Sequence, residues 1–210
     1  MLVNVYVDGF NLYYGCLKGT PYKWLDLDAL TRRLEPRHQI NRIRYFTAQI
    51  SPRPNDPHGH NRQQYYLRAL ATIPHLAIHL GRFQQTTKRM PLANPPTYGP
   101  RTVQVIKTEE KGSDVNLATH LLADAFRRDF EAALVITNDA DLAEPIRLVC
   151  HELELPVGVA NPHRPYKRSI ALERAHPTYF RQIRESALRS CQLPDTIHDS
   201  NGEIRRPIKW

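Results

Sequence analysis

The 210-residue chain lacks several features that mark common classes of protein. Its three cysteines are odd in number and far apart, so neither a disulfide framework nor a Cys-x-x-Cys metal site is expected. No apolar run approaches the roughly 20 residues of a membrane-spanning helix. Asp8 interrupts the first apolar segment too early for a signal peptide, and Gly-rich nucleotide-binding loops are missing. We therefore expect a cytoplasmic protein with no membrane association.

Acidic residues are also scarce relative to basic ones. The chain has 29 Lys and Arg against 21 Asp and Glu, which gives a net charge of +8. Residues 82–101 contain Arg82, Lys88, Arg89 and Arg101 and no acidic residue. This balance indicates an anionic partner such as nucleic acid.

Short apolar runs alternate with amphipathic segments along the chain. Strands are expected near residues 2–7, 43–47, 76–80, 103–108, 132–136 and 156–160, with helices between most of them. The alternation predicts a three-layer α/β domain with a mainly parallel sheet over residues 1–193. Residues 82–100 are expected to form a long Pro-rich loop, and two short helices are expected around Leu172 and Ile183. Residues 194–210 are expected to form an extended polar tail, whose Trp210 docks on the body.

Carboxylates stand at the predicted carboxyl ends of separate strands. Asp8 follows the first strand, Asp139 and Asp141 follow the strand at 132–136, and Asp114 lies in the first turn of a helix after Gly112. The carboxyl ends of parallel strands meet at one edge of the sheet, where such folds bind ligands. Asn138 or Asp139 alone could cap a helix, and Asp114 alone could be an ordinary acidic residue of a first turn, but clustered like charges destabilise an empty pocket. A divalent cation held by oxygen ligands relieves that repulsion, which favours Mg²⁺ or Mn²⁺ and metal-assisted phosphodiester hydrolysis.

Three segments carry a resemblance to a known family. In chain order they are residues 5–12 (VYVDGFNL), 111–115 (KGSDV) and 136–142 (ITNDADL). The chain thereby resembles NYN-domain proteins, which are PIN-like ribonucleases, over residues 2–193. The resemblance implies a PIN-like (Rossmann-like) fold, a Mg²⁺ or Mn²⁺ site and endonucleolytic cleavage of RNA, in single strands or structured loops. By motif match, the metal ligands and catalytic residues would be Asp8, Asp114, Asp139 and Asp141, with Asn11 orienting Asp8 or a phosphate and Asn138 holding the turn.

One departure from that family and several further signals bear on the site. Many relatives carry a second Asp six residues after Asp114, where this chain has His120, so the number of metal ions stays open. Tyr13 and Tyr14, beside the first motif, could stack on a base or pack in the core. The basic residues expected to contact RNA, if they are not merely a solvated surface, are Lys88, Arg89, Lys111, Arg164, Lys167 and Arg168.

Two other functions fit parts of the pattern. A non-catalytic RNA-binding module could keep the fold, and the His120 departure favours it. A haloacid-type phosphatase also uses acidic strand ends, but its Asp-x-Asp motif is missing at Asp8-Gly9-Phe10. The RNA target, the pathway and the choice between monomer and homodimer stay open.

Overall fold

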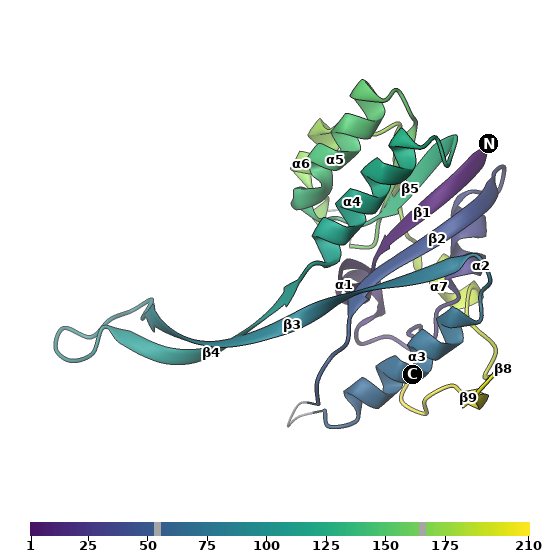
Figure 1. Cartoon of the computed structure of the whole chain (residues 1–210). Coiled ribbons are helices and arrows are strands. Elements are labelled where there is room, and N and C mark those ends of the chain that lie inside the picture. The colour runs from purple at the N-terminus through teal and green to yellow at the C-terminus, as the bar shows by residue number, and fades with distance from the viewer. Residues whose placement is uncertain (53–55, 164–166) are drawn as a thin grey trace.

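The fold is a central sheet with helices on both faces (Figure 1). The computed structural model describes residues 1–52, 56–163 and 167–210. These residues form a seven-stranded sheet in the order β4-β3-β2-β1-β5-β6-β7, in which β3 and β4 pair antiparallel and the other neighbours pair parallel. The strands are β1 (Leu2–Asp8), β2 (Gln39–Ala48), β3 (Leu76–Pro91), β4 (Thr102–Lys111), β5 (Ala132–Ile136), β6 (Val157–Asn161) and β7 (Tyr179–Gln182). The predicted three-layer α/β fold with a mainly parallel sheet is confirmed.

Different parts of the chain supply the two helical layers. One layer contains α1 (Gly9–Leu12), α2 (Leu27–Leu34), α3 (Gly59–Ala71) and α7 (Glu185–Ser190), and the other contains α4 (Ser113–Phe126), α5 (Ala143–Arg147) and α6 (Ile170–Arg174). A π-helical turn at Tyr13–Leu17 extends α1, and another at Leu148–Glu152 extends α5, which a 3-10 turn at Ala140–Leu142 precedes. None of the helices in the described ranges is long and apolar enough to cross a membrane.

The central strands are buried on both sides. Successive side chains of a strand point to opposite faces, so Val3, Val5 and Val7 join the core beneath α2 and α3, while Tyr6 joins the core beneath α4. β1 lies between β2 and β5, and the order of the strands reverses at this point. Ligands of open α/β sheets bind at the carboxyl ends of the strands beside such a reversal.

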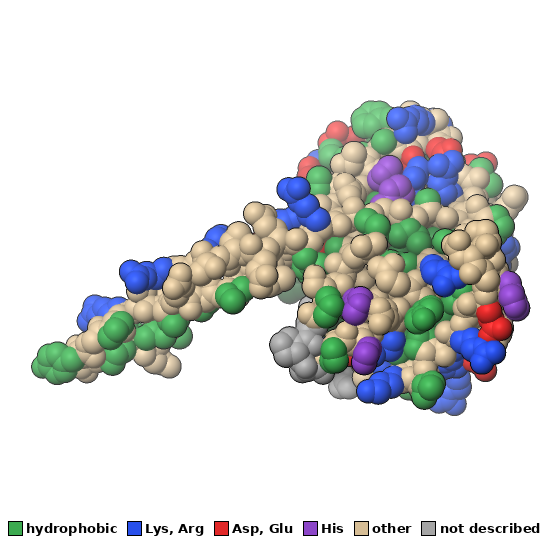
Figure 2. Space-filling model, turned by 60° about the horizontal axis from the view of Figure 1, so that its bottom comes forward, with side chains coloured by type: hydrophobic (Ala, Val, Ile, Leu, Met, Phe, Trp, Pro, Cys, Tyr) green, Lys and Arg blue, Asp and Glu red, His purple; other side chains and the backbone are tan. Residues whose placement is uncertain are grey.

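The expectation of a long loop at residues 82–100 is wrong for its first half. β3 continues to Pro91 and pairs with β4, from Arg82 opposite Lys111 to Pro91 opposite Thr102. The two strands form an arm that projects from the body (Figure 1 and Figure 2). Most of their side chains are exposed. A ribbon with water on both faces needs no alternation of apolar and polar residues, so β3 lacks the usual signal of a strand.

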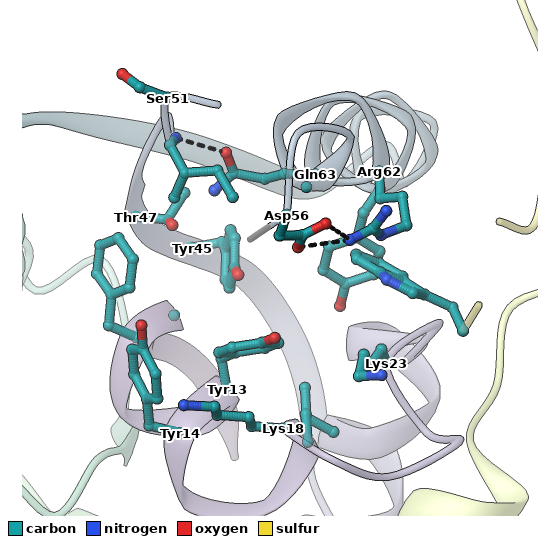
Figure 3. A pocket seen from close by; sticks show the side chains of 17 residues that line it. Tyr13, Tyr14, Lys18, Lys23, Tyr45, Thr47, Ser51, Asp56, Arg62 and Gln63 are labelled. Atoms are coloured by element: carbon teal, nitrogen blue, oxygen red, sulfur yellow. Dashed lines mark hydrogen bonds and ion pairs between the residues drawn. The ribbon is translucent and has the colours of Figure 1, made fainter. Parts of the chain in front are cut away.

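The C-terminal segment is more ordered than expected. Strands β8 (Thr196–Asp199) and β9 (Gly202–Arg205) form a hairpin, and Ile204 is fully buried in the core beside α3. Trp210 docks on the body as predicted, with its ring 5.7 Å from that of Tyr66, and it lines a pocket between α1 and α3 (Figure 3). The helix expected around Ile183 is wrong at that residue, because Ile183 lies between β7 and α7.

Candidate metal centre

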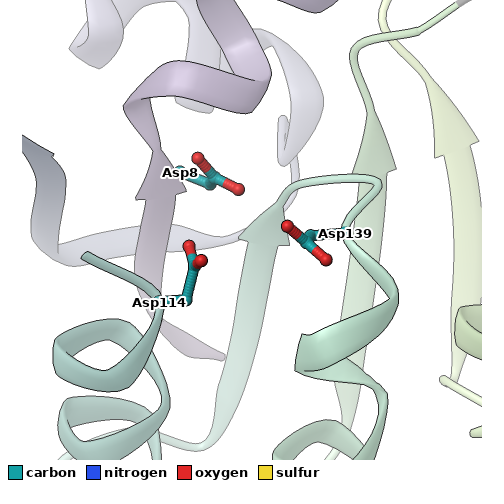
Figure 4. A group of neighbouring side chains, drawn as sticks. All are labelled: Asp8, Asp114 and Asp139. Carbon is teal, nitrogen blue, oxygen red and sulfur yellow. The ribbon is translucent and has the colours of Figure 1, made fainter. Parts of the chain in front are cut away.

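Three of the four predicted carboxylates come together at the reversal of strand order. Asp8 ends β1, Asp139 follows β5, and Asp114 lies in the first turn of α4. One carboxylate oxygen from each lies within 4.8 Å of the others. Figure 4 shows the three side chains pointing toward a common space. The sheet thus joins residues that are more than a hundred positions apart in the sequence.

Asp8 is fixed by two hydrogen bonds, one to each carboxylate oxygen. The backbone N–H of Asn11 donates to Oδ1 at 2.9 Å, and the hydroxyl of Thr137 donates to Oδ2 at 3.0 Å. The same hydroxyl oxygen accepts a hydrogen bond from the backbone N–H of Asp139 at 3.0 Å. Thr137 therefore ties Asp8 to the turn that carries Asp139. The sequence interpretation gave Thr137 no role beyond its place before Asn138 in the third motif.

Asp139 and Asp141 differ in position. Asp139 caps the 3-10 turn, because its Oδ1 accepts a hydrogen bond from the N–H of Asp141 at 3.0 Å. Both interpretations of Asp139 are thus compatible, since it caps a helical turn and also belongs to the cluster. Asp141 is exposed and lies outside the group of three close carboxylates. Its charge still raises the pKa of Asp114, which puts it at the rim of the centre.

Two asparagines brace the loops around the cluster. The side-chain oxygen of Asn11 accepts a hydrogen bond from the N–H of Asn138 at 2.9 Å, so α1 holds the end of β5. Asn138 in turn donates from Nδ2 to the carbonyl of Lys167 and accepts from the N–H of Ser169. Asn11 therefore orients Asp8 through its backbone and the Asp139 turn through its side chain.

Burial and mutual repulsion raise the pKa values of the carboxylates in the cluster. Burial, together with the charges of Asp114 and Asp139, raises the pKa of Asp8 to about 7, against the lowering effect of its two hydrogen bonds. Partial burial, then the charges of Asp139, Glu110 and Asp141, raises the pKa of Asp114 to about 6. Within the described ranges, the Asp114 carboxylate has no hydrogen-bond donor. A positive ion in the common space would relieve the repulsion.

The donor set suits a hard divalent cation. The described cluster offers carboxylate oxygens, which favour Mg²⁺, Mn²⁺ or Ca²⁺ over Zn²⁺. His120 does not join this cluster among the described residues. Its ring packs against His79, with 4.2 Å between ring centroids, and against Phe46. His120 therefore packs with His79 and Phe46 between α4 and the sheet, and its ring does not contribute to the carboxylate cluster in the described residues.

The predicted RNA-contacting residues are spread over two regions. Lys88, Arg89 and Lys111 lie on the arm. Lys167 is exposed, and Asn138 fixes its backbone beside the cluster. Arg168 already pairs with Glu173 at 2.7 Å and stacks on Phe180 at 3.8 Å, and Arg164 lies outside the described residues.

The fold and the carboxylate cluster together define an α/β protein with a nuclease-like fold. The chain belongs to the NYN domain family of PIN-like ribonucleases, which matches residues 2–183. The resemblance inferred from the three sequence motifs is thereby confirmed.

Two known proteins are similar to this chain, one in sequence and one in fold. The chain is 31% identical over 235 residues to 6-hydroxy-3-succinoylpyridine 3-monooxygenase HspA of Pseudomonas putida (strain DSM 28022 / S16), with 99% of this chain and 74% of that protein covered. A crystal structure of a protein of unknown function, VPA0982 from Vibrio parahaemolyticus RIMD 2210633, is similar with a TM-score of 0.56. That likeness covers 88% of this chain and 93% of the other at 14% identity, and it supports the fold alone.

Proposed function

We propose that the protein is a divalent-metal-dependent endoribonuclease that hydrolyses phosphodiester bonds in single-stranded or looped RNA. The observation that carries the proposal is the cluster of Asp8, Asp114 and Asp139 at the carboxyl edge of a NYN-family sheet. Asp8, Asp114 and Asp139 would hold a Mg²⁺ or Mn²⁺ ion, with Asp141 at the rim. Such an ion activates water and neutralises charge on a phosphate. Thr137 and Asn11 keep the ligands in place.

The basic residues of the arm support the proposal of a polyanionic substrate. Residues directly opposite each other in an antiparallel pair share a face, so Lys88 shares a face with Val105, and Arg82 shares that same face with Lys111. The basic residues on this face, which we call the basic face of the arm, are Arg82, Lys88, Lys107 and Lys111, and they accompany one acidic residue, Glu109. Arg89 lies on the opposite face. The basic face begins at Lys111, three residues before Asp114 in the chain, so it places cations along the arm that leads to the segment carrying Asp114.

A second candidate rests on the relative named as a monooxygenase. Identity of 31% over nearly the whole chain makes oxidation of a hydroxypyridine the alternative to RNA cleavage. The donor set of the cluster favours the nuclease proposal, because oxygen-only sites suit Mg²⁺ and Mn²⁺, whereas non-haem iron oxygenases commonly use two histidines and a carboxylate.

The two candidates are separated by parallel assays on one preparation. The full chain is incubated with an end-labelled single-stranded RNA and with a hairpin RNA, in Mg²⁺, in Mn²⁺ and in EDTA, beside Asp139→Asn as the matched control. We expect internal cleavage that EDTA and Asp139→Asn both abolish. Cleavage that neither EDTA nor Asp139→Asn reduces would refute the proposal. The absence of cleavage above the Asp139→Asn background in both Mg²⁺ and Mn²⁺ would also refute it. Oxygen consumption with 6-hydroxy-3-succinoylpyridine and a reductant, in place of RNA cleavage, would select the alternative.

A further inference from the structure

A pocket of about 280 Å³ opens on the sheet face covered by α1 and α3 (Figure 3). Gly9 and Phe10, the two residues that follow Asp8, line it, so the pocket adjoins the metal centre along the chain. A cavity of about 150 Å³ accommodates benzene. This pocket therefore has room for one aromatic ring with a substituent.

Aromatic side chains from four separate segments form much of the pocket wall. They are Phe10, Tyr13, Tyr14, Tyr45, Tyr66 and Trp210. Figure 3 shows Tyr13, Tyr14 and Tyr45 gathered around one side of the space. Protein cores close such spaces to near-crystalline density, so a hollow among six aromatic rings points to a ligand. Aromatic rings that face a cavity are the usual platform for stacking a base.

The wall is held in place before any ligand arrives. Tyr45 and Tyr66 are buried and meet edge to face, with 6.4 Å between ring centroids, and the Tyr66 hydroxyl donates to the carbonyl of Leu25 at 2.9 Å. Gly9 lets the start of α1 approach this wall, because a Cβ there would lie 2.8 Å from the Tyr45 ring and 2.7 Å from the carbonyl oxygen of Phe46. A preformed wall lowers the entropy cost of binding a flat ring.

The charges around the pocket favour an anion. Three cations, Lys18, Lys23 and Arg62, line it beside one carboxylate, that of Asp56. Arg62 is neutralised by Asp56, with Nη2 and Oδ2 2.6 Å apart, on the side of the pocket opposite Tyr13 and Lys18 (Figure 3). Lys18 lies 5.0 Å from the centre of the Tyr14 ring. Neither Lys18 nor Lys23 forms an ion pair with any described carboxylate, so both ammonium groups are available to a ligand.

We propose that this pocket binds a planar aromatic ring that carries an anionic group, with the ring against the tyrosines and the anion at Lys18 and Lys23. In RNA these parts are a base and its phosphate, an assignment that rests on the proposed ribonuclease function. A free aromatic acid offers the same chemistry. The position of Phe10 favours RNA, because its ring also contacts Phe83 at the base of the arm, 5.7 Å between centroids, which places the pocket beside the arm.

The test measures binding in EDTA, where the metal centre contributes nothing and RNA is not cleaved. Uridine 5′-monophosphate, uridine, inorganic phosphate and pyridine-3-carboxylate are titrated into the full chain by calorimetry. We expect the monophosphate to bind more tightly than uridine or phosphate alone. Tyr14→Ala should weaken its binding about 5- to 150-fold, the range found for loss of one stacking ring, and Tyr14→Phe should restore it. Lys23→Gln should weaken binding of the monophosphate and leave that of uridine unchanged, and Arg37→Ala, at an exposed position before β2, serves as the unaffected control.

Each outcome decides the proposal. Binding of pyridine-3-carboxylate without the monophosphate, and sensitive to Tyr14→Ala, supports the pocket chemistry and assigns a free aromatic acid as its source. Phosphate binding as tight as the monophosphate, or affinity that Tyr14→Ala leaves unchanged while the variant stays folded, would overturn the proposal. If the monophosphate binds as expected but RNA is not cleaved, the proposed function fails and the pocket stands. If RNA is cleaved but no ring-bearing ligand binds, the pocket proposal alone fails.

Discussion

Replacing Asp8 by Asn should stabilise the metal-free protein at pH 8. Because the pKa of Asp8 is raised in the folded state, the folded protein holds a proton that the unfolded chain has released between about pH 4 and pH 7. The free energy of unfolding of the wild type therefore falls as the pH rises through this range. The amide that replaces the carboxylate carries no charge, so the variant does not lose this stability as the pH rises. The substitution should therefore raise the free energy of unfolding above pH 7 and have little effect near pH 4.

The size of the effect follows from the pKa and the hydrogen bonds. A rise from 3.8 to about 7 corresponds to about 4 kcal/mol, at 1.36 kcal/mol for each pH unit. Asn offers a single acceptor oxygen, so the hydrogen bond from Thr137 must be reversed or lost, which costs about 1 kcal/mol. The balance of about 3 kcal/mol should raise the melting temperature by roughly 6–12 °C for a chain of this size.

The assay is thermal unfolding of wild type and variant in EDTA at pH 4, 6 and 8, and the difference between the two proteins removes the pH dependence of groups that do not interact with Asp8. Asp124→Asn is the matched control, because Asp124 is equally buried but pairs with Arg44 at 2.7 Å. That change leaves a buried cation unpaired and should destabilise by roughly 3–5 kcal/mol. If Asp8→Asn also lowers the melting temperature at pH 8, the Asp8 carboxylate stabilises the fold, and its burial beside Asp114 and Asp139 does not destabilise the metal-free protein.

Three further changes test the surroundings of the centre. Thr137→Val removes the hydroxyl that ties Asp8 to the Asp139 turn and should weaken Mn²⁺ binding about 10- to 100-fold in calorimetry; unchanged affinity would show that the tie is dispensable. Lys88→Ala should flatten the slope of log RNA affinity against log salt by roughly 0.7, whereas Arg89→Ala on the opposite face should leave it unchanged; equal effects would contradict binding along the basic face. His120→Asp should leave the number of bound Mn²⁺ ions unchanged, because His120 packs against His79; an added ion in calorimetry would place position 120 in the site.

The cluster was predictable because its members occupy positions that topology fixes. Asp8 and Asp139 each follow an apolar strand, and parallel neighbours bring their carboxyl ends together whatever the connecting sequence. The position of Asp141 depended on finer geometry. Asp139 caps the turn that begins at Ala140, and that turn leaves the Asp141 side chain exposed. The spacing of two carboxylates along the chain does not reveal which of them the cap turns inward.

The arm could not be predicted from periodicity for a physical reason. The buried strand β5 is a short run of Ala, Leu, Val and Ile, because both of its faces contact helices. The outer half of β3 contacts β4 and water, so Gln, Thr, Lys and Arg serve equally well at its positions. Its only local signals were the β-branched pair Thr86-Thr87 and the prolines that mark the far turn. Strand pairing outside the core is decided by the partner strand more than by the local pattern.

The substrate of this family member depends on the surfaces around the carboxylate cluster. The carboxylate cluster can hold a metal ion whatever the substrate, so it cannot by itself distinguish cleavage of RNA from chemistry on a small aromatic molecule. The basic face of the arm would favour a polyanion long enough to follow it, whereas the aromatic pocket would accept either a nucleotide or a free aromatic acid. An RNA substrate would therefore engage the basic face and the pocket together. A small substrate would require the pocket alone, so activity that survives Lys88→Ala but not Tyr14→Ala would indicate a small molecule.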